Sequence, residues 1–167
     1  SRGVAGAAGW LVIDAKWHPT FGRIGCLESL GAGPAVVRFA QKALRARARS
    51  LIKTLAKEQR GRITAELVAT AARRGDPTAR RVLAEVGSNL GRGIASIISL
   101  LNPEVVVVGG GLAGAGDPIL EPLRRAVRQW GQPLAARQVR IVRSRLGEDA
   151  GILGAARYAM LRLKGRI

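Results

Sequence analysis

Residues 101–112 read LNPEVVVVGGGL, and this run organises the chain around one strand and the turn that follows it. The four consecutive valines predict a strand that is buried on both faces, because an exposed face would require alternating polar residues. Pro103 cannot donate a hydrogen bond to a sheet, so the strand begins after it and the preceding helix ends before it.

Gly109, Gly110 and Gly111 follow the strand directly. Without Cβ atoms the backbone can turn tightly here, and a flat or phosphorylated ligand can approach main-chain N–H groups. Ligands of open α/β sheets bind at such carboxyl ends of strands. Three glycines alone leave two interpretations open: a ligand-binding turn, or a tight strand-to-helix turn without a ligand.

In the rest of the chain, the spacing of apolar residues and the positions of capping and turn residues predict mainly helices. Thr64 is an expected N-cap, and the 75–77 turn Gly-Asp-Pro should cap the longest helix. The predicted helices are Ala35 to about Leu55, Ala65 to about Arg73, Thr78 to about Leu101, Pro118 to Trp130 and Ile152 to about Leu163; the predicted strands are Trp10–Ile13, Val105–Val108 and Gln138–Val142. This order predicts an α/β fold with a parallel sheet.

Small residues are placed where helices could approach one another closely. Gly87, Gly91 and Gly93 interrupt the longest predicted helix, and each costs about 1 kcal/mol against Ala in a helix interior. Such a cost indicates close backbone packing or room for a ligand beside the helix. Ala155, Ala156 and Ala159 would likewise let the last helix lie close against a neighbour.

Composition limits the class of protein. The 167 residues suit one domain, and the net charge of +17 would suit nucleic acid or acidic ligands. The arginines are scattered without interleaved aromatic residues, and the run from Arg45 to Arg49 is typical of a solvated helix face.

Cys26 is the only cysteine, which excludes an internal disulfide and is compatible with a reducing cytoplasm. No run is apolar enough for a membrane span.

Three blocks of sequence resemble the ROK family of sugar kinases and sugar-responsive repressors. They occur in the family's order and span most of the chain: residues 22–28 (GRIGCLE, with Gly33-Pro34-Ala35 behind them), residues 100–112 and residues 146–156 (LGEDAGILGAA).

This resemblance implies an actin-like, ribonuclease-H-like ATPase fold of two lobes. Residues 1–167 would form the C-terminal lobe as a single unit with a short sheet and several packed helices, and the N-terminal lobe is absent from this chain. Gly109, Gly110, Gly111 and Leu112 would cradle the adenosine end of ATP, which binds with Mg²⁺, and Glu28 would hydrogen-bond sugar hydroxyls. The expected partners are a sugar, a nucleotide and a second copy of the chain.

The chain also departs from the family's pattern. Two zinc-binding cysteines are expected just before Gly22, where Pro19, Thr20 and Phe21 stand instead. The family's Gly-Glu-x-Gly-His sugar motif should fall between Gly6 and Trp10, which read Gly-Ala-Ala-Gly-Trp. One thiolate cannot hold a structural zinc ion, so no zinc is expected and Cys26 is interpreted as a small buried apolar residue.

Three functional interpretations remain. The first is the C-terminal lobe of a glucokinase-like ATP:hexose phosphotransferase, favoured by the intact glycine run. The second is the effector-binding and dimerisation lobe of a ROK repressor, which would contact nucleic acid only through an N-terminal domain absent here. The third is a degenerate lobe kept for dimerisation. Phosphoryl transfer needs positioned phosphates, a metal and a base. No catalytic residue is assigned in this chain, which alone is expected to be inactive.

Overall fold

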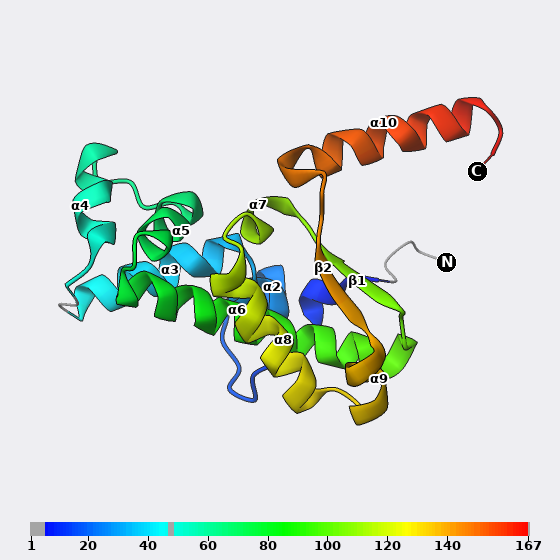
Figure 1. The fold of residues 1–167 in the computed structure, drawn as a ribbon, viewed down its shortest axis with the longest axis horizontal. Coiled ribbons are helices and arrows are strands. Elements are labelled where there is room, and N and C mark those ends of the chain that lie inside the picture. Colours follow the sequence, from blue (N-terminus) through cyan, green and yellow to red (C-terminus); the bar gives the residue numbers. More distant parts are fainter. Residues whose placement is uncertain (1–5, 47–48, 167) are drawn as a thin grey trace.

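The computed structural model describes residues 6–46 and 49–166 and shows a helical body that carries a short sheet (Figure 1). Two short 3-10 turns, η1 (Ala8–Trp10) and η2 (Gly147–Asp149), lie near the two ends. The remaining elements, in chain order, are α1 (Phe21–Ile24), α2 (Cys26–Gly31), α3 (Gly33–Arg45), α4 (Leu51–Glu58), α5 (Ala65–Arg73), α6 (Pro77–Leu101), β1 (Val105–Val108), α7 (Gly110–Ala113), α8 (Asp117–Trp130), α9 (Pro133–Gln138), β2 (Arg140–Arg143) and α10 (Ala150–Leu163).

Strands β1 and β2 are parallel, with Val105 opposite Arg140 and Val108 opposite Arg143. The predicted strand after Pro103 and the predicted parallel pairing are confirmed. The second strand begins two residues later than expected, because α9 occupies the start of the predicted segment. The guanidinium of Arg124 on α8 donates to the Ile141 carbonyl oxygen at 3.0 Å, which fixes the crossover helix to β2.

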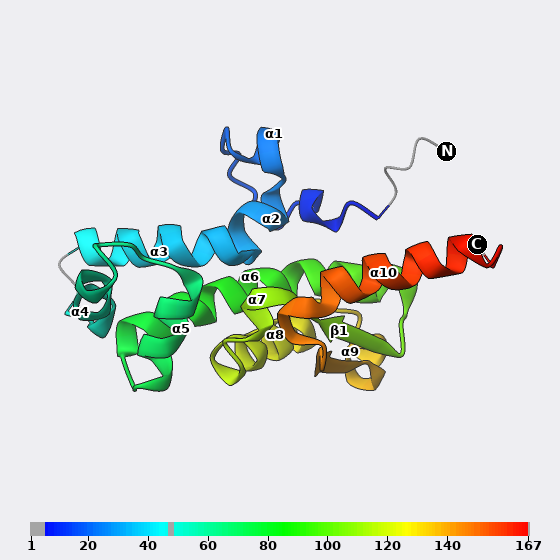
Figure 2. The same ribbon diagram turned by 90° about the horizontal axis from the view of Figure 1, so that it is seen from above.

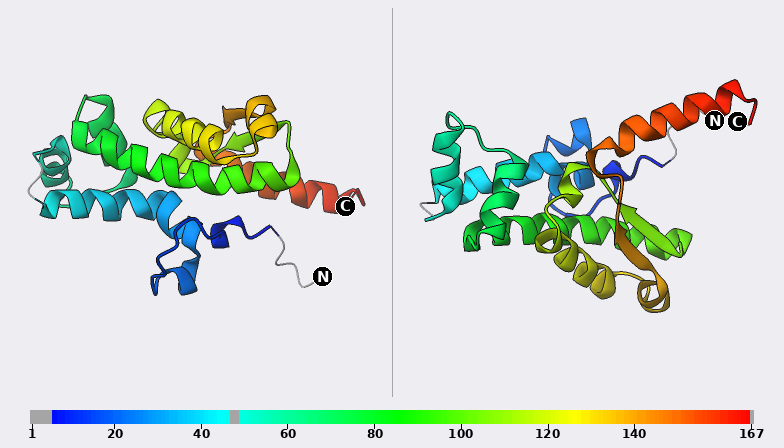
Figure 3. Two further views of the ribbon diagram at one scale, coloured as in Figure 1. Left: turned by 90° about the horizontal axis from the view of Figure 1, so that it is seen from below. Right: turned by 45° about the horizontal axis from the view of Figure 1, so that its top comes forward.

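Helix α6 is the central element, with α3 on one side and α8 on the other (Figure 3). A Cβ added at Gly91 would lie 2.5 Å from the Leu123 carbonyl oxygen and 2.7 Å from the Ala126 Cβ, and one at Gly87 would overlap the Ile119 carbonyl. Gly93 leaves room for the Leu27 side chain of α2. Of the two alternatives left open for these three glycines, the structure supports close packing, because protein atoms occupy the space beside each of them.

Two apolar clusters fill the body. One lies between α3, α4, α5 and the first half of α6, and the other lies between the second half of α6, β1, α8 and α9.

The helix caps predicted at Thr64 and Asp76 are both present, and one of them connects two helices. Thr64 accepts from the Leu67 N–H, and a hydrogen bond from the Thr64 side chain lowers the pKa of the Glu66 carboxyl. The buried Asp76 carboxylate accepts from the Ala79 N–H at 2.7 Å and from the Leu51 N–H at 2.6 Å, which connects α6 to α4.

Two expectations about the first half of the chain are wrong. Residues 11–13 form no strand, because their backbone bonds to the region of α2 instead: the Leu27 N–H donates to the Leu11 carbonyl oxygen, and the Ile13 N–H donates to the Cys26 Sγ. The single helix expected from Ala35 to about Leu55 is two helices, α3 and α4. The second begins at Leu51 and is capped by Ser50, whose hydroxyl accepts from the Ile52 N–H.

The expected burial of β1 on both faces is also wrong for the described residues. Val108 is buried, but Val107 is 59% exposed and Val105 is 40% exposed, because only one face of the two-stranded sheet lies against helices. Helix α10 likewise contains no buried residue and extends away from the body (Figures 1 and 2), so its alanines do not pack against a neighbour as predicted. We call the exposed residues Val105, Val107 and Val142 the bare sheet face.

Gly91→Ala should destabilise the fold, because its methyl group would collide with the backbone of α8 rather than with a movable side chain. We expect a loss of roughly 1–3 kcal/mol in the free energy of unfolding, as for overpacked cores. Gly154→Ala is the matched control, since a Cβ there meets nothing within 4 Å and Ala is the better helix former. Chemical denaturation measures both; equal stability of the two variants would contradict close α6–α8 packing.

Candidate functional site

The glycine run lies where the two parallel strands end. Gly109 follows β1 in extended conformation, and Gly110 has φ +73°, in the left-handed region that side chains rarely adopt. The Ser144 N–H, just after β2, donates to the Val108 carbonyl oxygen at 2.8 Å. The carboxyl ends of β1 and β2 therefore meet directly beside the glycines.

A small cavity of about 110 Å³ opens at this meeting point. Its walls come from both βα turns: Gly109, Gly110, Gly111, Ala113 and Gly114 on one side, and Arg143, Ser144 and Gly147 on the other. A Cβ at Gly110 would meet nothing within 4 Å, so the glycine leaves open space beside the turn rather than serving close packing. The site has the position and the exposed backbone that an anionic or flat ligand requires.

Sequence reasoning found only the first of these two turns. Arg143, Ser144 and Gly147 were not predicted to belong to the site, although Arg143 ends β2 and the other two follow it, as the glycine run follows β1. The βαβ order already implied that the ends of the two strands would lie side by side. Leu112, in contrast, does not line the cavity, and its side chain packs against the first apolar cluster.

Glu28 lies in the first turn of α2 with an exposed side chain. It borders Gly9, where an added Cβ would lie 3.1 Å from the Glu28 Cβ and 3.5 Å from its Oε2. Gly25, with φ +87°, makes this possible, because a side chain there would overlap the Gly9 carbonyl. The structure thus brings Glu28, on α2, beside the segment expected to hold the sugar motif, and these elements are separate from the glycine run.

The residues at the predicted metal position do not fit zinc. Cys26 is 4% exposed, and its sulfur accepts from the Ile13 N–H. Trp10 and Phe21 lie near it and line a cavity of about 330 Å³ with Trp17. Among the side chains that the structure describes, which do not include that of Glu148, no three or more His, Cys, Asp or Glu residues form a cluster that could hold a metal ion. A single buried sulfur among indole and phenyl rings lacks the donor set that zinc requires.

The described helices include none with both the length and the apolarity to cross a lipid bilayer. The longest, α6, carries Arg80, Arg81, Glu85 and Arg92 along its length.

Comparison with known proteins places these features in a family. The model of the ROK family matches residues 1–161. Glucokinase of Thermotoga maritima is 36% identical over 164 residues, which cover 98% of this chain and 51% of that protein. The chain therefore spans about half the length of this relative.

Two further relatives represent different activities. The solved structure of a ROK family glucokinase from Streptomyces griseus, in complex with glucose and AMPPNP, has 32% sequence identity and a TM-score of 0.69, over 80% of this chain and 44% of that one. The xylose repressor of Caldicellulosiruptor bescii is 28% identical over 92% of this chain and 38% of its own length. Kinases and repressors are thus both among its relatives.

Purified protein should contain zinc at far below one ion per chain, because Cys26 is the only thiol and is buried, so it offers a single inaccessible donor. Elemental analysis after extensive chelator washing measures this directly. Cys26→Ser provides the control: it should leave the metal content unchanged, since the thiol is not a ligand. One zinc ion per chain that survives washing and is lost in Cys26→Ser would contradict this interpretation.

Proposed function

The chain belongs to the ROK family, and from this premise we propose that it is the C-terminal lobe of an ATP-dependent sugar kinase of the glucokinase type. Its fold is that of the actin-like ROK sugar kinases. One observation carries the proposal: the glycine run forms an open cavity at the carboxyl ends of both parallel strands, in a chain 36% identical to a glucokinase. This position is where α/β sheets bind ligands.

In this proposal the glycine cavity receives part of ATP, which arrives as its Mg²⁺ complex. Gly109, Gly110 and Gly111 offer backbone without side chains, and Arg143 adds a positive charge on the opposite wall. The cavity volume of about 110 Å³ is smaller than the roughly 300 Å³ of the smallest ordinary ligand sites. The remainder of the nucleotide would therefore lie against surfaces outside this cavity.

Glu28 would bind the sugar. Its exposed carboxylate can accept hydrogen bonds from sugar hydroxyls, and its position beside Gly9 matches the segment that holds the family's sugar motif. That segment contributes neither a Glu nor a His in this chain, since it ends in Gly9-Trp10. Sugar recognition would therefore depend on Glu28 and on groups outside the motif.

A second lobe would complete the protein. The bare sheet face and the apolar residues of α10, including Ile152 at 73% and Leu163 at 89% exposure, are surfaces that folded proteins normally cover. The Thermotoga maritima glucokinase is about twice as long as this chain, which supports an N-terminal lobe as their cover. The phosphate-binding loop and the base for phosphoryl transfer would come from that lobe, in a cytoplasmic protein.

The second candidate function is the effector-binding lobe of a repressor. It is favoured by the loss of the Glu and His from the sugar motif at Gly6–Trp10, and by the similarity to a xylose repressor. A repressor would bind its sugar through the same region, and would bind DNA through an N-terminal domain. A repressor needs no ATP, so ATP binding by the protein separates the two functions.

Gly110→Val should weaken ATP binding to the two-lobed protein by about tenfold or more, because the side chain would enter the cavity. Gly75→Val is the matched control: Gly75 also has positive φ (+89°) and open space, but lies at the α5–α6 turn. Both variants should lose similar stability, and only Gly110→Val should lose ATP affinity, with glucose affinity retained. Calorimetry with each ligand measures this; parallel loss of ATP affinity in both variants would leave Gly110 a turn-former only.

Glu28→Gln should show the opposite pattern. Removing the charge weakens a charge-assisted hydrogen bond to a hydroxyl, so glucose affinity should fall by roughly 10-fold to 100-fold while ATP affinity stays unchanged. Unchanged glucose binding in this variant would exclude Glu28 from the sugar site. A phosphotransfer assay on the parent protein separates kinase from repressor, because a repressor would bind sugar without producing ADP.

This chain by itself should self-associate through the bare sheet face. Replacing Val105 and Val107 with Thr keeps β-branched side chains while adding hydroxyls, so the double variant should be more nearly monomeric with little change in melting temperature. Val108→Thr is the control that should destabilise the fold, because Val108 is buried. Sedimentation velocity over a concentration series measures association; a parent chain that remains monomeric throughout contradicts the prediction.

A further inference from the structure

We propose that a second cavity, between the 14–21 segment and α3, is a binding site for a small sugar phosphate. This cavity is separate from both parts of the proposed kinase site, since neither Glu28 nor any residue of the glycine run lines it. The inference therefore does not depend on the proposed phosphoryl transfer.

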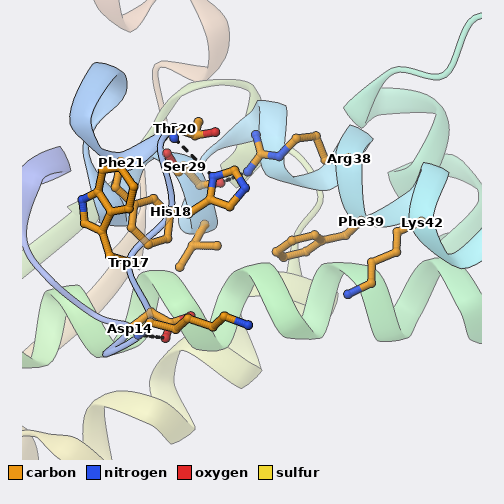
Figure 4. Close-up of a pocket in the computed structure, with 11 residues that line it drawn as sticks. Asp14, Trp17, His18, Thr20, Phe21, Ser29, Arg38, Phe39 and Lys42 are labelled. Carbon is orange, nitrogen blue, oxygen red and sulfur yellow. Dashed lines mark hydrogen bonds between the residues drawn. The ribbon is translucent and has the colours of Figure 1, made fainter.

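The cavity has the size of a ligand site. Its volume is about 440 Å³, within the range of roughly 300–1,000 Å³ that small-molecule sites occupy. Its lining comes from the loop before α1, which projects from the body (Figure 2), and from residues of α1, α2 and α3 (Figure 4).

Aromatic rings line two sides of this space. Trp17, His18 and Phe21 come from the projecting segment, and Phe39 comes from α3 (Figure 4). Trp17 is 69% exposed, which is unusual because tryptophan is on average a highly buried residue. An exposed indole beside other rings provides a flat apolar surface on which the ring of a small ligand can lie.

Three cations line the same space: Lys16 from the loop, and Arg38 and Lys42 from α3. The Arg38 guanidinium donates to the Ser29 carbonyl oxygen, and this bond fixes its direction. A guanidinium has five N–H donors in a rigid fork, so further donors remain for an anion. Asp14 is the one carboxylate among the lining residues.

The balance of charge points to a phosphate ester. Three cations and one carboxylate leave a net charge of +2 on the lining, which matches the charge of about −1.5 to −2 on a phosphate monoester at neutral pH. A carboxylic acid would neutralise only half of this charge. Planar guanidinium groups and lysine ammonium groups are also the side chains that usually hold phosphate oxygens.

The remaining polar groups can bind the hydroxyls of a sugar. The Asp14 carboxylate, held by the Lys16 N–H at 2.9 Å, can accept hydrogen bonds from hydroxyls. The His18 Nδ1 accepts from the Thr20 N–H at 3.2 Å, so in the neutral ring Nε2 carries the hydrogen and can donate. An acceptor and a donor beside aromatic rings match the hydroxyl groups and the apolar face of a hexose.

The test is calorimetric titration of the protein with glucose 6-phosphate, AMP and inorganic phosphate. We expect glucose 6-phosphate to bind more tightly than either of the others, with a change in tryptophan fluorescence. Lys42→Gln and Trp17→Ala should each weaken its binding by about tenfold, as expected for loss of one charged or stacking contact. ATP binding should not change in either variant.

Matched controls are available on the same chain. Lys57→Gln removes an exposed cation from α4, and Trp130→Ala removes another exposed indole, both outside the cavity. Neither should alter glucose 6-phosphate binding. If Trp17→Ala melts earlier than the parent, Lys42→Gln decides the result, because its exposed side chain has no packing role.

Three outcomes would overturn the proposal. Inorganic phosphate binding as tightly as the sugar phosphate would mean that only charge is recognised. AMP binding more tightly would assign the cavity to a nucleotide. Equal affinities for glucose 6-phosphate in parent, Lys42→Gln and Trp17→Ala proteins would place the ligand elsewhere. Failure of the kinase proposal is distinguishable, since it would appear as loss of ATP and glucose binding with this site unaffected.

Discussion

The contact on which this structure depends is the backbone-to-backbone approach of α6 and α8. Carbonyl oxygens of Ile119 and Leu123 occupy the space where side chains at Gly87 and Gly91 would stand. Helix α6 leads into β1, and α8 leads from β1 towards β2, so the separation of these helices sets the relative position of the strands. The cavity at the strand ends is therefore a consequence of two missing methyl groups more than 15 residues earlier in the chain.

Much of the fold could be predicted from local signals. The valine run after Pro103 and the caps at Thr64 and Asp76 each have a physical cause that lies within a few residues. The glycines of α6 indicated close packing from the sequence, but not that the α8 backbone is the neighbour. The predictions were wrong where contacts with residues distant in the sequence determine the local structure. Trp10–Ile13 has the composition of a strand, but its backbone finds partners at α2 and Cys26. The periodicity from Ala35 to Leu55 continues across the α3–α4 break, because both helices place apolar residues against the same cluster.

The candidate sites were predictable to different extents. The glycine run predicted a turn. The positions of Arg143 and Ser144 beside that turn follow from the pairing of β1 with β2 and have no local signal in the sequence. The aromatic and basic cavity gave no recognisable spacing, since Trp17 and Phe39 are more than 20 residues apart and come from a loop and a helix. Phe21 stands at one of the positions where the family carries a metal motif, and its ring lines both the cavity at Cys26 and the cavity beside α3.

Helix α10 starts from a turn that is also a wall of the glycine cavity. Gly147, with φ +56°, lines that cavity and lies three residues before the first residue of α10. The helix has 14 residues, hence a length of about 21 Å at 1.5 Å per residue, and it buries none of them against the body. A rotation of about 10° at this pivot would move its far end by roughly 4 Å. The same turn therefore sets the direction of α10 and the shape of one cavity wall, so a change in its backbone would alter both together.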